Sequence, residues 1–408
     1  MNLTGNTFFV ITIVLVVIAV LLPLLFWSRL RGPAVVRGAG RLVMVLFAQA
    51  TAVLVVFVAV NNANGLYDSW DDLLGTSNHV NTAVDLGPSG TGGRQISSLP
   101  KMRQKFEKVD DPTLGSGLRR TKLKGGISGV EGEVYVWLPP QYDDPAYRSK
   151  QFPVVELLSG FPGSSRSWFR AMKAQSRIQP LIESGKVAPF ILVSPRTMLL
   201  GASDHGYANI PGTVNADSWL TVDVRKMVAD NFRVSLNADS WAIAGYSAGG
   251  HGAAKLALAH PDRYRAAVSL SGYNDPASEK DSITGSDPEL RRENDVLNIL
   301  KSAGKPPRVS LLATGEGVDG YLPGVALQRA AKAPTRVEVR KTTGGHLTRV
   351  WGKELPYVFE WLTRQMHLQG MNQDQSRGEA AGQAQGRDEG RVLDGLEEAP
   401  QSATALLE

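Results

Sequence analysis

The chain has 408 residues, of which 43% are hydrophobic and 20% charged, so a large buried core is possible. Its formal net charge of +5 is small, and it contains no basic helix, zinc finger or aromatic-rich basic strand, so we expect no nucleic-acid partner. Cysteine is absent, which excludes disulfides, zinc–thiolate sites and a cysteine nucleophile.

Two uncharged apolar stretches, 8–27 and 42–60, come first, and each is long enough as a helix to cross a bilayer. The loop between them contains arginines and no acid, so the positive-inside rule places it in the cytoplasm and the rest of the chain outside. A cleaved signal peptide is the alternative for the first stretch, and a buried core helix for the second. We predict that residues 1–62 form a two-helix anchor in the cell membrane, with membrane lipids as partners.

The segments on either side of the central part of the chain are polar. Asn, Asp, Gly and Ser dominate after the second apolar stretch, so we predict a partly ordered linker at 63–120. A basic stretch at 101–124, which overlaps the end of this linker, fits either a solvated surface or contact with anionic headgroups. Residues 369–408 have almost no large apolar side chains, so we predict a disordered tail.

Between 121 and 368, short apolar runs alternate with helical patterns. Such runs suit strands that are buried on both faces of a parallel sheet. They occupy 132–140, 153–160, 188–195, 240–245, 264–272 and 308–315. Helical patterns at 217–232 and 250–260 lie between them. The alternation predicts one α/β domain, with helices on both faces of a mostly parallel wound sheet.

The segment from Gly245 to Gly249 matches the pattern G-x-S-x-G, with Ser247 in the middle. It lies where a predicted strand must turn sharply into a predicted helix. Small residues at the two glycine positions allow that turn, and the serine is held strained and exposed beside the free N–H groups of the helix start. We therefore predict that Ser247 is a nucleophile; an ordinary serine in a glycine-rich turn is the alternative.

A serine nucleophile needs a base and an acid that orients the base, and on this type of fold both follow the serine in the chain. Of the histidines, His346 lies late in the chain, in a Gly-Gly loop after a strand-like segment, and is the candidate base. The strand before it ends in a turn that contains Glu316 and Asp319. We favour Asp319 as the acid and keep Glu316 as the alternative.

The oxyanion that forms during ester cleavage needs two N–H donors. Ala248 follows the nucleophile, and Phe161 follows Gly160 in the loop after an earlier strand; we predict these two amides. Candidate substrate contacts are Ser159, Tyr246, His205 and Trp351. His205 belongs to the loop 197–219, which we expect at the mouth of the pocket.

With these residues assembled, the region 129–368 resembles the putative esterase family of the α/β-hydrolases, which includes esterase D-type enzymes and actinobacterial mycolyltransferases. The matching stretches are VYVWLPPQYDDP, VVELLSGFPG, SWLTVDVRKMVADNFRV, WAIAGYSAGGHGA and GGHLTRVW. The resemblance implies an α/β-hydrolase fold, the roles assigned above, and no metal or organic cofactor. The anchored layout is also similar to that of proteins of actinobacterial envelopes.

The chain departs from the mycolyltransferases at the oxyanion loop, where Ser159 and Pro162 replace residues that help to hold the sugar. The leading hypothesis is therefore a membrane-anchored extracytoplasmic serine esterase that forms an acyl-enzyme with an ester substrate, for which an envelope lipid or glycolipid is a candidate. An acyltransferase that passes the acyl group to a sugar or glycerol hydroxyl is the first alternative. A catalytically silent hydrolase-like envelope scaffold is the second.

Overall fold

The computed structural model describes residues 3–367, and every structural statement below concerns these residues. The tail predicted at 369–408 lies outside them. One sheet of nine strands organises the catalytic region, in the order β1-β2-β3-β5-β4-β8-β9-β10-β11. Its strands are β1 Glu107–Lys108, β2 Leu118–Lys124, β3 Glu131–Trp137, β4 Val154–Leu158, β5 Ile191–Pro195, β8 Trp241–Tyr246, β9 Ala266–Leu270, β10 Ser310–Gly315 and β11 Arg336–Lys341. A separate hairpin pairs β6 Asn209–Ile210 with β7 Val214–Asn215.

The sheet is parallel from β5 to β11 and antiparallel from β1 to β3 and on to β5. The strands β4, β5, β8 and β9 are buried along their whole length. This burial explains why their sequences are continuous apolar runs, because helices cover both faces of a parallel sheet. Each of the six predicted runs overlaps a strand, and the predicted mostly parallel α/β sheet with helices on both faces is confirmed.

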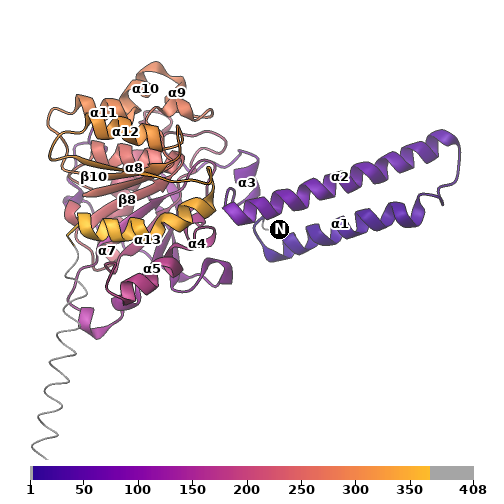
Figure 1. The fold of residues 1–408 in the computed structure, drawn as a ribbon, viewed down its shortest axis with the longest axis horizontal. Helices are drawn as coiled ribbons and strands as arrows, with labels where there is room; N and C mark the ends of the chain where they lie inside the picture. The colour runs from indigo at the N-terminus through magenta and orange to yellow at the C-terminus, as the bar shows by residue number, and fades with distance from the viewer. Residues whose placement is uncertain (1–2, 368–408) are drawn as a thin grey trace, which may run out of the picture.

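Helices cover the two faces of the sheet (Figure 1). One core cluster joins the sheet to α7, α8, α11 and α12, and a second joins it to α4, α5 and α13. The bounds are α3 Trp70–Leu73, α4 Ser167–Arg170, α5 Ala174–Glu183, α6 Ala216–Ser218, α7 Arg225–Asn231, α8 Ala248–Ala259, α9 Ile283–Ser286, α10 Pro288–Asn294, α11 Val296–Ser302, α12 Tyr321–Ala330 and α13 Thr348–Gln365. A π-helical segment, 219–224, joins α6 to α7, so the helix predicted at 217–232 is present with one wider turn.

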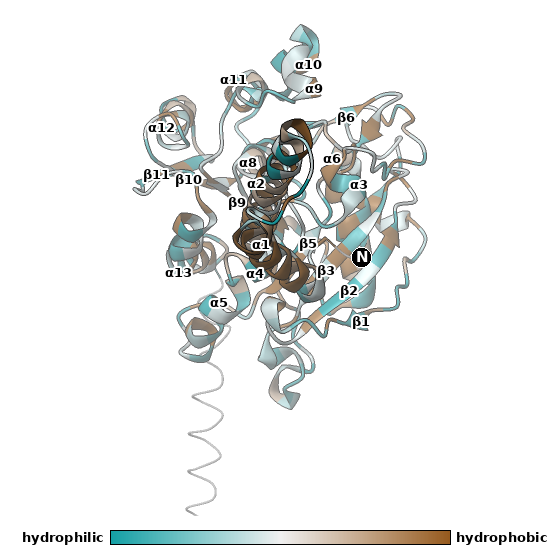
Figure 2. Ribbon diagram, turned by 90° about the vertical axis from the view of Figure 1, so that its right-hand side faces the viewer, coloured by the Kyte–Doolittle hydropathy of each residue, from teal (hydrophilic) through white to brown (hydrophobic). Residues whose placement is uncertain are grey.

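The first two helices, α1 Asn6–Phe26 and α2 Ala34–Asn64, form an antiparallel hairpin that projects from the domain (Figure 1). Both are long and apolar enough to cross a membrane. In Figure 2 the ribbons of both helices are mostly brown, the colour of hydrophobic residues, and large apolar side chains such as Leu24 and Val35 are 74% and 82% exposed. The helix α2 begins earlier than the predicted 42 and includes Arg37 and Arg41, because no proline follows Pro33 there, and Gly38 and Gly40 weaken a helix without ending it.

The segment predicted as a partly ordered linker, 63–120, packs closely on the catalytic domain. Asp72 is buried and forms an ion pair with Arg196, with 3.1 Å between Oδ1 and Nη1. The backbone of His79 bonds to Leu199 and to Glu131. The composition of this segment is that of a loop, but its polar groups have partners in the domain, so its ordering is decided by tertiary contacts.

Candidate active site

Ser247 lies on a strained turn between β8 and α8. Its φ of 56° and ψ of −127° are unusual for a residue with a side chain, and the strain exposes the hydroxyl beyond the strand end. The turn requires glycine on both sides. A Cβ at Gly245 would lie 1.9 Å from the carbonyl oxygen of Gly249, and a Cβ at Gly249 would lie 2.5 Å from two carbonyl oxygens at the end of β4. The backbone N–H of Ser247 donates to Leu270 at 2.9 Å, which ties the turn to β9.

Asp319 lies in a tight turn directly after β10. The backbone groups of Glu316 and Asp319 exchange two hydrogen bonds, of 2.8 and 2.9 Å. Gly315 lies under the turn, since a Cβ there would be 1.9 Å from the carbonyl oxygen of Asp319. The side chain of Asp319 is therefore presented from a fixed backbone at the same edge of the sheet as Ser247.

His346 lies in the loop between β11 and α13, after two glycines with positive φ, Gly344 and Gly345. Its Nδ1 is 2.8 Å from Asp319 Oδ1. Glu316 has a different partner, because its Oε2 accepts the backbone N–H of Gly344 at 3.3 Å. The structure thus pairs the predicted base with the favoured acid, and it uses the alternative acid to hold the loop of the base.

Two aromatic rings connect His346 to the strand that carries Ser247. The His346 ring meets Trp351 edge-on, with centroids 4.8 Å apart, and Trp351 stacks on Tyr246 at 4.7 Å. The indole N–H of Trp351 donates to Ser271 Oγ at 3.0 Å, and Ser271 lies at the end of β9. Within the part of the chain that the structure describes, no hydrogen bond joins Ser247 Oγ to His346; such bonds are often long before substrate binds.

The loop after β4 lies against the nucleophile. A Cβ at Gly160 would be 3.0 Å from Ser247 Cβ, so only glycine allows this approach. Next to it, the N–H groups of Phe161 and of Ala248 have no acceptor among residues 3–367. Phe161 follows the glycine that approaches Ser247, and Ala248 follows Ser247 itself, so their roles as oxyanion donors remain a prediction that this arrangement allows.

The segment that follows α2 holds the same loop from outside. The carbonyl oxygen of Gly65 accepts the backbone N–H of Ser164 at 2.9 Å and the hydroxyl of Ser167 at 2.8 Å. Asp68 accepts the Ser164 hydroxyl at 2.6 Å and lies 3.6 Å from Arg166 Nε. Sequence reasoning missed these residues, since no local pattern distinguishes them from other polar linker residues.

All four predicted substrate contacts are buried, at 5% exposure or less, so their side chains leave little surface for a substrate. Ser159 is fully buried and donates to the carbonyl oxygen of Ser164 at 2.6 Å. Tyr246 is packed between Trp168 and Trp351. His205 is 2% exposed, both its ring nitrogens are bonded, and burial lowers its pKa to about 4, so it is neutral and structural.

The fourth, Trp351, is also nearly buried, at 5% exposure. Its contact with the His346 ring makes it a packing partner of the base rather than a surface for substrate. The burial of these side chains depends on how distant elements pack against each other, and the sequence near each residue does not show it.

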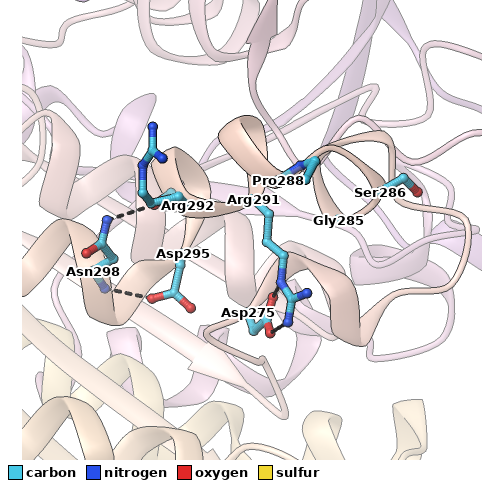
Figure 3. A pocket seen from close by; sticks show the side chains of 8 residues that line it. All are labelled: Asp275, Gly285, Ser286, Pro288, Arg291, Arg292, Asp295 and Asn298. Atoms are coloured by element: carbon cyan, nitrogen blue, oxygen red, sulfur yellow. Dashed lines mark hydrogen bonds and ion pairs between the residues drawn. The ribbon is translucent and has the colours of Figure 1, made fainter.

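An open cleft of about 530 Å³ lies elsewhere, over α9, α10 and α11 (Figure 3). Arg291 and Asp275 pair across it, while Asp295 bonds to the backbone of Asn298. None of the four predicted catalytic side chains, Ser247, His346, Asp319 and Glu316, lines it. Residues 3–367 contain no group of three or more His, Asp or Glu that could hold a metal ion.

A serine on a strained strand-to-helix turn of a mixed α/β sheet defines a class of enzyme, and the chain is a serine hydrolase. The profile of the family described as "Putative esterase" matches residues 128–362, and the chain belongs to that family.

Three known proteins are similar to this chain in sequence or in fold. A protein of Corynebacterium glutamicum described as uncharacterized is 25% identical over 349 residues, which is 78% of this chain and 76% of that protein. A ferulic acid esterase structure is 21% identical, with a TM-score of 0.50, and the match covers 61% of this chain and 98% of that one. An S-formylglutathione hydrolase from Agrobacterium tumefaciens is 16% identical, with a TM-score of 0.50, over 65% of this chain and all of that one. The two structures show the shared fold.

Proposed function

We propose that the protein is a membrane-anchored esterase that cleaves carboxylic esters through an acyl-enzyme on Ser247. The observation that carries this proposal is the pairing of His346 Nδ1 with Asp319 Oδ1, at 2.8 Å, at the sheet edge where the strained turn presents Ser247. A serine hydroxyl is a weak nucleophile unless a base removes its proton, and the paired imidazole is placed to act as that base.

In the first half of the reaction, Ser247 Oγ bonds to the ester carbonyl carbon while its proton moves to His346 Nε2. Asp319 keeps the other ring nitrogen protonated and stabilises the imidazolium. The N–H groups of Phe161 and Ala248 bind the oxyanion. The proton then passes to the leaving alcohol as its C–O bond breaks. In the second half, His346 again acts as the base while water attacks the acyl-enzyme. The carboxylic acid product leaves, and the proton returns to Ser247 Oγ, which restores the free enzyme.

The anchor is formed by α1 and α2. Their apolar side chains are largely exposed, which suits lipid as the surrounding medium better than water. Their connecting loop contains Arg29 and Arg31, so we place it in the cytoplasm and the catalytic domain outside.

A fluorophosphonate probe tests the chemistry. We expect the probe to label the folded full-length protein and not to label the Ser247→Ala variant. A folded wild-type protein that does not react would instead support a silent scaffold. Products analysed with and without an acceptor alcohol then separate hydrolysis from acyl transfer, because a transferase forms a new ester only when the acceptor is present.

Orientation is tested separately by one introduced cysteine, since the natural chain has none. Lys305 is exposed and lies in the catalytic domain. With Lys305→Cys, an impermeant thiol reagent should label intact cells. Labelling only after lysis would reverse the orientation, and it would leave the esterase assignment unchanged.

A further inference from the structure

The end of α2 lies at the candidate active site. Asn64, the last residue of α2, accepts a hydrogen bond from Thr348 Oγ1 at 3.1 Å, and Thr348 is two residues after His346. The next residue, Gly65, bonds to Ser164 and Ser167 of the loop that carries Phe161. The same helix end therefore contacts both the loop of the base and the loop of the predicted oxyanion donor.

The start of α1 reaches the same region. Thr4 lies 3.4 Å from Arg166 Nη1, and Leu3 and Phe8 pack with Val58 of α2 in one buried cluster. Both ends of the helical hairpin on the domain side are thus attached beside the catalytic loops. Figure 1 shows the hairpin projecting from the domain beside α3 and α4, and α2 contacts α4.

The position of these contacts relative to the bilayer follows from where the apolar part of α2 ends. The apolar stretch ends at Val60, and Asn64 is four residues later, about 6 Å farther along a helix. Headgroups extend about 5–8 Å beyond the hydrocarbon on each side of a bilayer. Asn64 and the loops that it contacts are therefore at headgroup level. Tyr67 and Trp70 follow, and such side chains are enriched at this level.

A second observation is the apolar character of the catalytic rim. Three large apolar side chains in the acid turn and the base loop, or next to them, are exposed: Val318 at 82%, Leu322 at 51% and Leu347 at 40%. Val318 precedes the acid and Leu347 follows the base. Exposed apolar groups clustered around a polar site indicate contact with another apolar surface.

From these contacts we propose that the candidate active site opens onto the bilayer that holds α1 and α2, and that its substrate is an ester carried by a lipid of that leaflet. The inference rests on the proposed esterase function and anchor. The helix end positions the two catalytic loops at headgroup level, and the apolar rim contacts the acyl region of the lipid. The enzyme then takes its substrate by lateral diffusion, without extracting it into water.

Full-length protein in phosphatidylcholine vesicles tests the substrate. A phosphatidylcholine with a self-quenched fluorescent acyl chain is placed either in the same vesicles or in separate ones, and p-nitrophenyl butyrate measures esterase activity in solution. We expect hydrolysis to be at least about tenfold faster in the shared bilayer, because tethering raises the effective concentration. Ser247→Ala should abolish all three activities.

Equal rates in shared and separate vesicles, or no lipid hydrolysis in either, would overturn the inference if the soluble ester is still cleaved. Loss of the soluble activity would instead contradict the esterase function itself.

A measurement of position is independent of catalysis. A bimane label at Leu347→Cys should be strongly quenched by lipids that carry a nitroxide on the headgroup. The matched label at Lys305→Cys, near the amino end of β10 and away from the site, should keep its fluorescence. Equal quenching at the two positions, or none at Leu347→Cys, would show that the site does not face the bilayer.

Discussion

At the scale of single residues, the geometry of one turn decides which carboxylate meets the base. Glu316 and Asp319 exchange backbone hydrogen bonds, and this fixed turn presents their side chains to different parts of the loop that contains His346. The shorter side chain reaches His346 Nδ1, and the longer one bonds to the backbone at Gly344. His346 and Asp319 are 47% and 31% exposed, so their pairing contributes little to stability and its value is in orienting the imidazole.

We expect Asp319→Asn to lower kcat by about 10⁴-fold with little change in KM, because the imidazole loses its orienting carboxylate. Glu316→Gln should lower kcat by less than about tenfold, since a glutamine oxygen can still accept the Gly344 N–H. Steady-state kinetics on a soluble ester measure both. A crippling effect of Glu316→Gln alone would reassign the acid. If neither matters while Ser247→Ala is inactive, another group orients the histidine.

At the scale of elements, the joint between β8 and α8 depends on close backbone contact. The atoms that crowd Gly245 are backbone atoms of the helix start, so they cannot move aside without shifting α8.

Gly245→Ala should therefore destabilise the protein by more than about 4 kcal/mol or prevent folding, because the new methyl group overlaps the carbonyl oxygen of Gly249. Gly304→Ala is the matched control, since no atom lies within 4 Å of its Cβ position, and it should change stability by about 0.5 kcal/mol or less. Denaturant unfolding in detergent compares them. Equal stability of the two variants would refute the steric argument.

The segment after α2 acts on the oxyanion loop through Asp68, which lies beside Ser164 and Arg166. With Asp68→Asn, we expect kcat on a soluble ester to fall about tenfold at unchanged KM, because the loop that carries Phe161 loses its support. Asp110→Asn, at an exposed position of the same segment, is the control and should behave like wild type. An unchanged kcat for Asp68→Asn would show that the loop holds its geometry by itself.

At the scale of the whole molecule, the core contains an acid whose charge state is coupled to folding. Glu156 of β4 is fully buried, and burial raises its pKa to about 8; the Tyr264 hydroxyl, 2.8 Å from Oε2, and the charge of Arg225 oppose the rise. A carboxyl group with a higher pKa in the folded state holds its proton there while the unfolded chain releases it. Its contribution to the free energy of unfolding therefore falls as pH rises from about 4.5 to about 8.

Glu156→Gln keeps the shape of the neutral acid and removes its titration. We expect Tm to decrease less from pH 5 to pH 8 in this variant than in wild type, when thermal unfolding of the full chain is measured in detergent. Glu293→Gln, on the exposed side of α10, should leave the wild-type pH dependence intact. An equal decrease in Tm for Glu156→Gln and wild type over this pH range would show that Glu156 is not the titrating group.

The sequence by itself determined the two apolar helices, the alternation of strands and helices, and the glycines around Ser247. Each depends on neighbouring residues: apolar length, the period of hydrophobicity and the space that a sharp turn allows. It also located the loops of the acid and the base, because these follow strand ends.

Only the tertiary structure showed that Asp319, and not Glu316, pairs with His346. It also showed that Tyr246 and His205 are buried and that Trp351 packs against His346. It also brought Asn64 to Thr348 across 284 residues of sequence. Such contacts depend on how distant elements meet at one edge of the sheet. No local pattern encodes the contact of Asn64 with Thr348, since both are short polar side chains that would be equally suited to a solvated loop.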